Sequence, residues 1–237
     1  MLKILFLFSL LSLNALSKEI PGIIKSDKGG LEDYSGFIVY LKEGPKLKKI
    51  NKKKTTHIVT QVNKNFSPAV SAISAGSSVD FKNYDDIFHN VFSLSPEKKF
   101  DLGIYKGDKK FNEEFKPIKE EKYSTKVDFP RPGKIKVFCN IHENMMSTIY
   151  VFDHGYYSQV SKDGHFKLPV PNSGNVTIVV DGERLKNPIR KKFSVKKIKT
   201  PLKIKFSAVD RKPVPKHSTK DGKKYEKEWS LDEDEFY

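Results

Sequence analysis

The sequence predicts an all-β protein, and three observations support this prediction. Aromatic and β-branched residues, which favour strands, are frequent, with 17 Phe and 10 Tyr among 237 residues. Short apolar or alternating runs recur along the chain. Turn sequences such as Asp163-Gly164 and Asp181-Gly182 separate several of these runs. We therefore expect strands joined by tight turns and arranged in two β-sandwiches.

Residues 1–17 are expected to be a secretory signal peptide. Lys3 gives a positively charged start, and residues 4–16 form an apolar segment of the expected length. That segment is too short to span a bilayer comfortably, and the small residues around Ala15 suit a signal peptidase. We expect the mature protein to begin near Lys18, to lack a stable transmembrane anchor and to be periplasmic or secreted.

Residues 18–152 are expected to form the first domain, a β-sandwich. Its strand candidates are Pro21–Lys25, Gly36–Leu41, His57–Val62, Val70–Ile73, Val79–Phe81, His89–Leu94, Lys126–Phe129, Lys134–Phe138 and Thr148–Phe152. Residues 96–122, between two of these strands, are highly charged. We expect an irregular loop there, with a short helix around Asn112–Phe115.

Residues 153–208 are expected to form a second, smaller β-sandwich. Its strand candidates are Tyr156–Val160, His165–Val170, Asn175–Val180, Lys192–Val195 and Leu202–Ala208. No cluster of metal-ligating residue types occurs in this part of the sequence. Residues 209–237 carry many charges and little apolar surface, so we expect a disordered tail.

The formal net charge is +15, and lysine supplies most of the positive charge. This charge serves solubility alone, or it steers the protein toward an acidic partner or an anionic surface. The sequence shows no arginine and aromatic pattern of a nucleic-acid interface, so nucleic acid is not an expected partner. It also shows no nucleophile–base arrangement and no Gly-rich phosphate loop, so we do not expect an enzyme.

The stretch from Cys139 to Met146 carries the most specific chemistry. It holds the only cysteine of the chain and lies between two strand candidates. His142 follows Cys139 by three residues, and Met145 follows His142 by three, so a thiolate, an imidazole and a thioether share one tight turn. Thiolate and thioether suit copper, and imidazole binds it too. The alternative for a lone exported cysteine is a small buried hydrophobic residue or an intermolecular disulfide.

A trigonal copper site needs a second imidazole from elsewhere in the sheet. His89 is the candidate, because we expect its strand to lie beside the strand that ends at Cys139. Asn90 would then link the two ligand loops and donate a hydrogen bond toward the thiolate. Met145 is the expected axial ligand and Met146 the alternative. Neighbouring residues of a strand point to opposite faces, so only one of the two is expected to reach the ion.

These residues carry a resemblance to a known family. His89-Asn90-Val91 with Cys139, His142 and Met145 is similar to the cupredoxins of the plastocyanin, amicyanin and pseudoazurin group. Five longer segments resemble bacterial methylamine-utilisation-type cupredoxin-domain proteins: Asn65–Pro68, Phe81–Asp85, Phe88–Ser95, Lys98–Leu102 and Cys139–His142. Methylamine oxidation itself is not implied, because the family name reflects genome labels.

The resemblance covers about residues 19–208 and implies a Greek-key cupredoxin β-sandwich with one copper ion, cycling between Cu(I) and Cu(II). It also implies that residues 153–208 form a carboxypeptidase-regulatory-like, or transthyretin-like, β-sandwich. The charged segment 107–122 is longer than the family usually carries.

The ligand set predicts an exported type 1, or blue, copper protein that carries single electrons between redox partners, one of them with an acidic surface. Two alternatives stay open. The first is a periplasmic protein that buffers or delivers copper without electron transfer. The second is a non-catalytic structural or interaction module.

Overall fold

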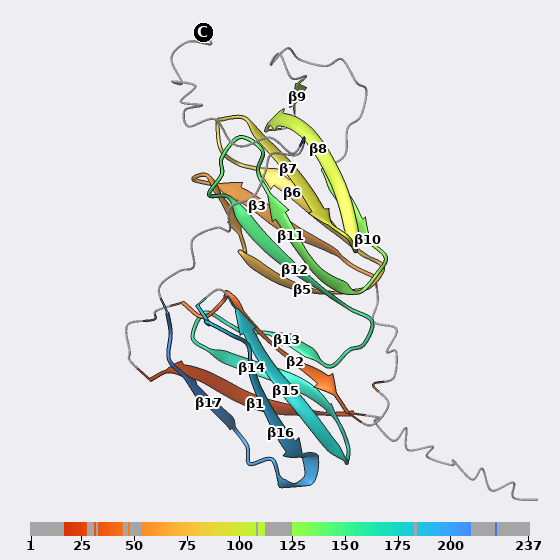
Figure 1. Cartoon of the computed structure of the whole chain (residues 1–237), viewed down its shortest axis with the longest axis vertical. Coiled ribbons are helices and arrows are strands. Elements are labelled where there is room, and N and C mark those ends of the chain that lie inside the picture. Colours follow the sequence, from red (N-terminus) through yellow and green to blue (C-terminus); the bar gives the residue numbers. More distant parts are fainter. Residues whose placement is uncertain are drawn as a thin grey trace, which may run out of the picture.

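Two β-sandwiches are stacked along the long axis of the protein (Figure 1). This computed structural model describes residues 17–27, 31, 33–44, 47, 54–107, 109–111, 125–182, 184–209 and 221. The expected signal peptide, the expected helix around Asn112–Phe115 and nearly all of the expected tail lie outside these residues. Within them, the regular structure is strands and one 3-10 turn, η1 (Val195–Lys197), which confirms the all-β prediction. The same residues contain no helix with the length and apolarity that crossing a membrane requires.

The first sandwich packs a four-stranded sheet on a six-stranded sheet, with strand orders β10-β6-β3-β4 and β5-β12-β11-β7-β8-β9. The four-stranded sheet contains β3 (Thr56–Val62), β4 (Asn65–Ser67), β6 (Ser77–Asn83) and β10 (Lys126–Phe129). The six-stranded sheet contains β5 (Val70–Ser74), β7 (His89–Ser95), β8 (Lys98–Lys106), β9 (Lys109–Phe111), β11 (Gly133–Phe138) and β12 (Met146–Phe152).

Alternation along the strands builds the core between these two sheets. In β6, Val79 and Phe81 are fully buried, while Ser78 and Asp80 are partly exposed. They join one core cluster with Ile135 and Val137, which alternate in the same way along β11. Period-two burial is expected for strands that bury a single face against the opposite sheet.

The second sandwich packs a four-stranded sheet on a three-stranded sheet, with strand orders β13-β2-β15-β16 and β14-β1-β17. The larger sheet contains β2 (Phe37–Glu43), β13 (Tyr157–Gln159), β15 (Asn175–Gly182) and β16 (Ile189–Ser194). The smaller sheet contains β1 (Ser17–Ser26), β14 (His165–Pro171) and β17 (Leu202–Phe206). The core between these two sheets is almost wholly aliphatic and aromatic.

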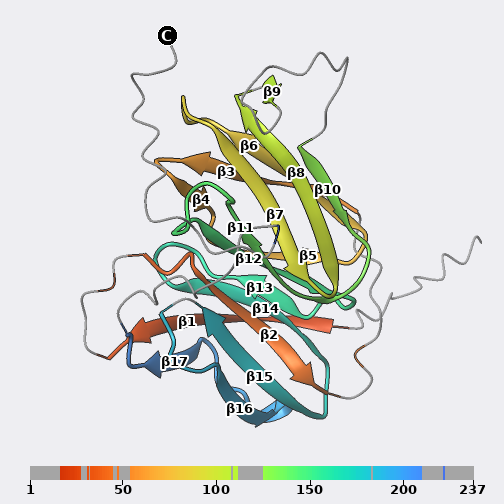
Figure 2. The same ribbon diagram turned by 45° about the horizontal axis from the view of Figure 1, so that its top comes forward.

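The boundary between the sandwiches differs from the predicted one. Residues 18–152 were expected to form the first domain, but β1 and β2 pair with strands of the second sandwich. β1 lies between β14 and β17, and β2 lies between β13 and β15. Figures 1 and 2 both show these two strands among β13–β17. The reason is packing, because Ile20, Ile24 and Phe37 belong to the core of the second sandwich.

Strand β8 occupies part of the segment expected to be an irregular loop. It pairs with β7 and places Phe100, Leu102 and Tyr105 against the core of the first sandwich. Phe100 and Leu102 alternate with the charged, exposed Lys99 and Asp101. The charge concealed this short alternation, and the prediction of a loop was therefore wrong over Lys98–Lys106.

The two sandwiches meet through β12 and β5 of the first and β2 of the second. Ile38 and Tyr40 pack on Tyr150 and Phe152, and the rings of Tyr40 and Phe152 lie 5.1 Å apart. The Tyr150 hydroxyl donates to Asp181 Oδ2 at 2.6 Å, and Lys134 Nζ reaches the same oxygen at 3.1 Å. Apolar contacts and a buried, paired carboxylate therefore hold the sandwiches together.

Candidate metal centre

Two neighbouring strands bring the predicted ligands together. Cys139 directly follows β11, and His89 is the first residue of β7. β11 and β7 are antiparallel, with Phe138 opposite Phe92, which confirms the expectation that these strands are neighbours. The antiparallel direction carries the chain after Phe138 toward the first residue of β7. His142 lies in the turn that leads back into β12.

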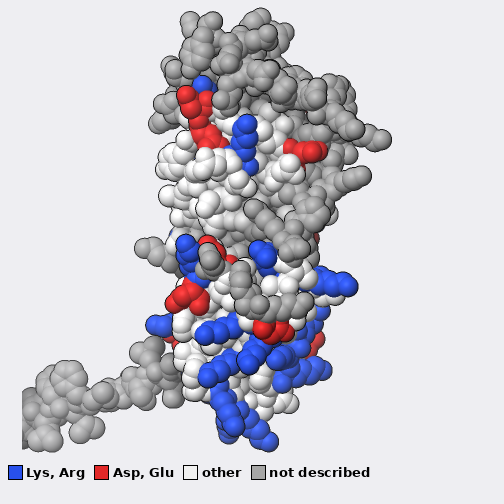
Figure 3. Space-filling model, turned by 90° about the vertical axis from the view of Figure 1, so that its left-hand side faces the viewer, with Lys and Arg blue, Asp and Glu red and all other residues white. Residues whose placement is uncertain are grey.

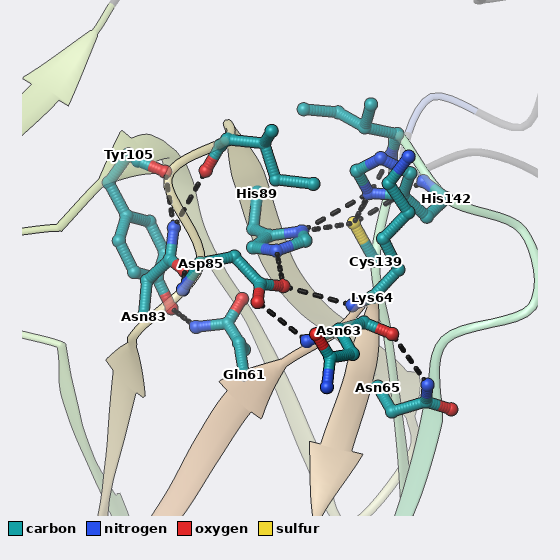
Figure 4. A network of polar contacts seen from close by, with 12 residues as sticks. Gln61, Asn63, Lys64, Asn65, Asn83, Asp85, His89, Tyr105, Cys139 and His142 are labelled. Carbon is teal, nitrogen blue, oxygen red and sulfur yellow. Dashed lines mark hydrogen bonds and ion pairs between the residues drawn. The ribbon is translucent and has the colours of Figure 1, made fainter.

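The three side chains point their donor atoms at one another (Figure 4). Cys139 Sγ lies 3.9 Å from His89 Nδ1 and 3.7 Å from His142 Nδ1, and the two Nδ1 atoms are 3.1 Å apart. The group of His89, Cys139 and His142 has the donor types and spacing of a metal site. A circle through three atoms at these separations has a radius of about 2 Å, the length of metal–imidazole and metal–thiolate bonds. The donor set therefore fits one metal ion.

Asp85 fixes the orientation of the His89 ring. His89 Nε2 lies 2.9 Å from Asp85 Oδ2, and the His89 ring is fully buried. A carboxylate only accepts hydrogen bonds, so Nε2 carries the proton and Nδ1 presents its lone pair to Cys139 and His142. Carboxylate–histidine pairs of this kind set the tautomer and basicity of metal ligands.

Hydrogen bonds to nearby residues in turn hold Asp85 in place. The backbone N–H groups of Asn63 and Lys64, in the turn between β3 and β4, donate to its two carboxylate oxygens at 2.5 and 2.9 Å. Its own N–H donates to Asn83 Oδ1 at 2.9 Å. Burial raises the pKa of Asp85, but hydrogen bonds from Lys64, His89 and Asn63 outweigh burial and leave the pKa below its usual value. Asp85 therefore stays charged and in place.

Backbone donors surround the sulfur of Cys139. The N–H groups of Ile141 and His142 each lie 3.4 Å from Sγ. Burial raises the pKa of the Cys139 thiol, and hydrogen bonds from the backbone N–H groups of Asn90, His142 and Ile141 oppose that shift. A buried sulfur with three donors around it is suited to be a thiolate once a cation compensates its charge.

The two histidines are held neutral, as metal ligands must be. Burial is the main cause for both rings, and it lowers the pKa of His142 to about 4. The pKa of His89 is also lowered by burial, although Asp85 pulls in the opposite direction. His142 is half-buried, whereas His89 and Cys139 are fully buried. His142 is therefore the ligand closest to solvent.

The two methionines differ in burial. Met145 is fully buried and belongs to the same core cluster as Cys139. Its backbone closes the ligand turn, because Met145 N–H donates to the His142 carbonyl and the Met145 carbonyl accepts from Cys139 N–H. Met146 is half-buried and is paired with Phe138 in the sheet. Burial in the same core cluster as Cys139 favours Met145 as the axial ligand, and this assignment stays a prediction.

Asn90 does not use its side chain as expected. Its Nδ2 donates to Asp101 Oδ1 at 2.6 Å and to the Gly103 carbonyl at 3.0 Å, so the amide links β7 to β8. The prediction that this amide donates toward the thiolate was therefore wrong. The backbone N–H of Asn90 takes that role instead. The position was identified correctly, but the direction of the side chain depends on a strand that the sequence did not reveal.

The sequence did not identify Asp85 as a functional residue. It lies in Asn83-Tyr84-Asp85-Asp86, and Asp is common in turns because its side chain forms local hydrogen bonds with the backbone. The signal that points to it is its position four residues before a candidate ligand. Asn83 was missed in the same way. Its Nδ2 donates to the carbonyls of Ile87 and Tyr105, which ties β6 to β8 and to the segment just before β7.

No family model matches the chain, and no curated protein matches it. Solved structures do match. A copper-containing nitrite reductase from Thermus scotoductus SA-01 is 21% identical with a TM-score of 0.32, over 40% of this chain and 22% of its own. A purple cupredoxin from Nitrosopumilus maritimus is 17% identical with a TM-score of 0.30, over 40% and 99%. An oxidised mutant of amicyanin is 13% identical with a TM-score of 0.32, over 48% and 98%.

These solved structures are copper proteins of the cupredoxin type, and each match covers less than half of this chain. This chain spans about a fifth of the nitrite reductase. Similarity this low says nothing of activity, so the metal site rests on its own side chains. The transthyretin-like interpretation of residues 153–208 stays a prediction.

Proposed function

We propose that the protein is an exported type 1 copper protein that carries single electrons between redox partners. The observation that carries the proposal is the convergence of one thiol sulfur and two imidazole nitrogens at separations of 3.1 to 3.9 Å. A thiolate and two imidazoles are the three in-plane ligands of blue-copper sites.

Four residues of this chain would hold the ion. His89 and His142 offer Nδ1, Cys139 offers Sγ, and Met145 is the proposed axial ligand, with Met146 as its rival. Copper, when bound, supplies the one-electron chemistry. The chain's own contribution is rigidity. Strands β7 and β11, together with the hydrogen bonds that hold Asp85 in place, fix the ligands before any ion binds. Fixed ligands keep the geometry similar in both oxidation states.

The half-buried edge of His142 is the proposed point of electron exit. The other ring and the sulfur are fully buried, so a partner approaches the metal most closely through His142. The basic character of the chain, with its net charge of +15, favours a redox protein with an acidic surface as that partner. Catalysis is not part of the proposal.

The test is to add Cu(II) to the metal-free protein and to record its visible and electron paramagnetic resonance spectra. We expect one copper ion per chain, intense thiolate-to-copper absorption and the small hyperfine coupling of a type 1 site. Cys139→Ser is the matched control, because it replaces sulfur by oxygen at nearly constant size and should abolish the absorption. A copper-loaded protein without that absorption would refute the proposal.

Copper buffering or delivery without electron transfer is the second candidate. The burial of Cys139 and Met145 in one core cluster favours it, since thiolate and thioether are soft donors that suit Cu(I). Repeated oxidation and reduction separates the two functions. An electron carrier cycles reversibly at a fixed potential and keeps its copper, whereas a delivery protein gives the ion up to a metal-free acceptor.

A further inference from the structure

One edge of the second sandwich carries a concentrated positive charge. Residues 184–209 contain no Asp or Glu. Nine basic side chains of this segment are exposed. The eight that lie between the start of β16 and the end of β17 are called the basic edge here: Arg190, Lys191, Lys192, Lys196, Lys197, Lys199, Lys203 and Lys205. On the face drawn in Figure 3, Lys and Arg gather over the second sandwich.

The fold explains why these eight residues share one edge. β16 is the last strand of the four-stranded sheet and pairs with β15, while β17 is the last strand of the three-stranded sheet and pairs with β1. Only η1 and a short turn separate β16 from β17 along the chain. Lys203 and Lys205 alternate with the core residues of β17, and therefore point outward.

The basic edge is electrostatically uncompensated within the described residues. Ion pairs between Lys and carboxylates lie elsewhere, as in Lys82–Asp80, Lys106–Asp86 and Lys134–Asp181. None of the eight side chains of the basic edge forms such a pair with a described carboxylate. Gathering like charges on one edge costs free energy through repulsion, and a partner of opposite charge would relieve that cost.

The composition of the basic edge fits a diffuse negative surface. Seven of its eight cations are Lys, which is a point charge on a flexible stem and lacks the planar fork of Arg that recognises single carboxylates or phosphates. The aromatic residues beside them, Phe193 and Phe206, face the core, so no ring is free to stack on a base. Each Lys or Arg near an anionic bilayer adds about 1 kcal/mol of attraction.

The position of the basic edge argues against a dock for the redox partner. Strand β12 starts with Met146 beside the ligand turn and ends with Phe152 at the second sandwich, about 20 Å away along the strand. The second sandwich therefore covers the end of the first that lies away from the metal centre (Figure 1). A surface bound to the basic edge would leave the metal centre accessible.

We propose that the basic edge docks the protein on a bilayer surface rich in acidic phospholipid, with the metal centre facing away from the lipid. The second sandwich then acts as an electrostatic anchor, and the packed contact between the sandwiches sets the orientation of the metal centre. The docking itself does not depend on copper, so it can be tested on the metal-free protein.

The experiment is co-sedimentation of the complete metal-free chain with vesicles. One set contains phosphatidylglycerol and phosphatidylcholine, and the other contains phosphatidylcholine alone. We expect binding to the acidic vesicles that weakens as salt rises, because exposed charges are screened. Changing Arg190, Lys191 and Lys192 together to Gln should weaken that binding about a hundredfold, from the loss of three attractions of about 1 kcal/mol each.

The matched control changes Lys54, Lys99 and Arg131, three exposed cations of the first sandwich, to Gln. It removes the same charge elsewhere and should leave vesicle binding within a few-fold of the wild type. Three outcomes would overturn the proposal: equal binding to both vesicle sets, equal losses in the two triple variants, or binding to a soluble acidic protein with none to acidic vesicles. Circular dichroism checks that each variant is folded.

Discussion

The two sandwiches share an architecture but bury different chemistry. Ten of the twelve buried polar side chains among the described residues belong to the first sandwich, including His89, Asn90, Asn83 and Gln61. The second buries Thr177 and Asp181, and Asp181 belongs to the contact with the first. The first sandwich therefore keeps polar groups inside, while the second keeps an apolar interior and its charges outside.

This difference separates two physical tasks. A buried polar group destabilises a fold unless it is hydrogen-bonded, so the first sandwich needs many specific partners to hold its ligands. The second sandwich holds no predicted ligands, so its apolar core contributes mainly to stability. Four predictions test this contrast, in order of decreasing effect.

Leu168→Ala should have the largest effect on stability and none on the metal centre. Leu168 is fully buried in the core of the second sandwich, and a cavity there should lower the free energy of unfolding by about 3 kcal/mol. Urea denaturation followed by circular dichroism measures the loss. The visible spectrum of the copper-loaded variant should equal that of the wild type; a changed spectrum would mean that the sandwiches do not divide these tasks.

Asp181→Ala should weaken the contact between the sandwiches. The change leaves the Tyr150 hydroxyl without its acceptor in a mostly buried position, at a cost of about 2 kcal/mol. Because the contact couples two separate cores, unfolding should also become less cooperative. Asp153→Ala, at an exposed position just after β12, is the control and should change stability little. Equal losses in both variants would contradict the prediction.

Asp85→Asn should act on the metal rather than on the fold. An amide keeps one oxygen that can accept from His89 Nε2, but it is neutral, so it no longer raises the basicity of the ring as the carboxylate does. We expect copper affinity to fall by about 10- to 100-fold, measured by competition with a chelator. Asp86→Asn changes the neighbouring carboxylate, which is exposed, and should leave the affinity unaltered.

The smallest predicted effect is a dependence of stability on pH in the metal-free protein. The pKa of His142 falls from 6.5 to about 4 on folding, so between these values the unfolded chain binds more protons. Stability should therefore fall as the pH drops from 6.5 to 4, by on the order of 1 kcal/mol, because the ring is partly exposed and screened. The midpoint of urea denaturation measures it. His142→Gln should flatten the dependence, and an unchanged slope in that variant would contradict it.

Features encoded over a few residues were predictable from the sequence. The turn between β11 and β12 was located by its flanking alternation, and the spacing of Cys139 and His142 identified the two candidate ligands that it contributes. His89 required one further step, a neighbouring antiparallel strand, and the pairing of Phe138 with Phe92 supplies it. The axial ligand stays a prediction, because burial alone distinguishes Met145 from Met146.

Features that depend on distant pairing were not predictable. The N-terminal strands β1 and β2 have the pattern of ordinary half-buried strands. Their sequences do not indicate that they pair with strands more than 100 residues away. Asp85 was not predicted for a similar reason, since its role requires both the turn at Asn63 and Lys64 and the ring of His89 to lie against its carboxylate. Local pattern gives the strands, and tertiary packing decides which of them meet.

The place of β1 and β2 has a consequence for synthesis. The ribosome releases these two strands first, yet their partners β13 to β17 emerge only after the whole first sandwich. The half with the proposed metal centre can therefore fold as a closed insertion while the half that hosts it is still incomplete. Because β2 lies directly beside β13, joining them by a short linker should yield the host alone, a compact unit that lacks His89, Cys139 and His142.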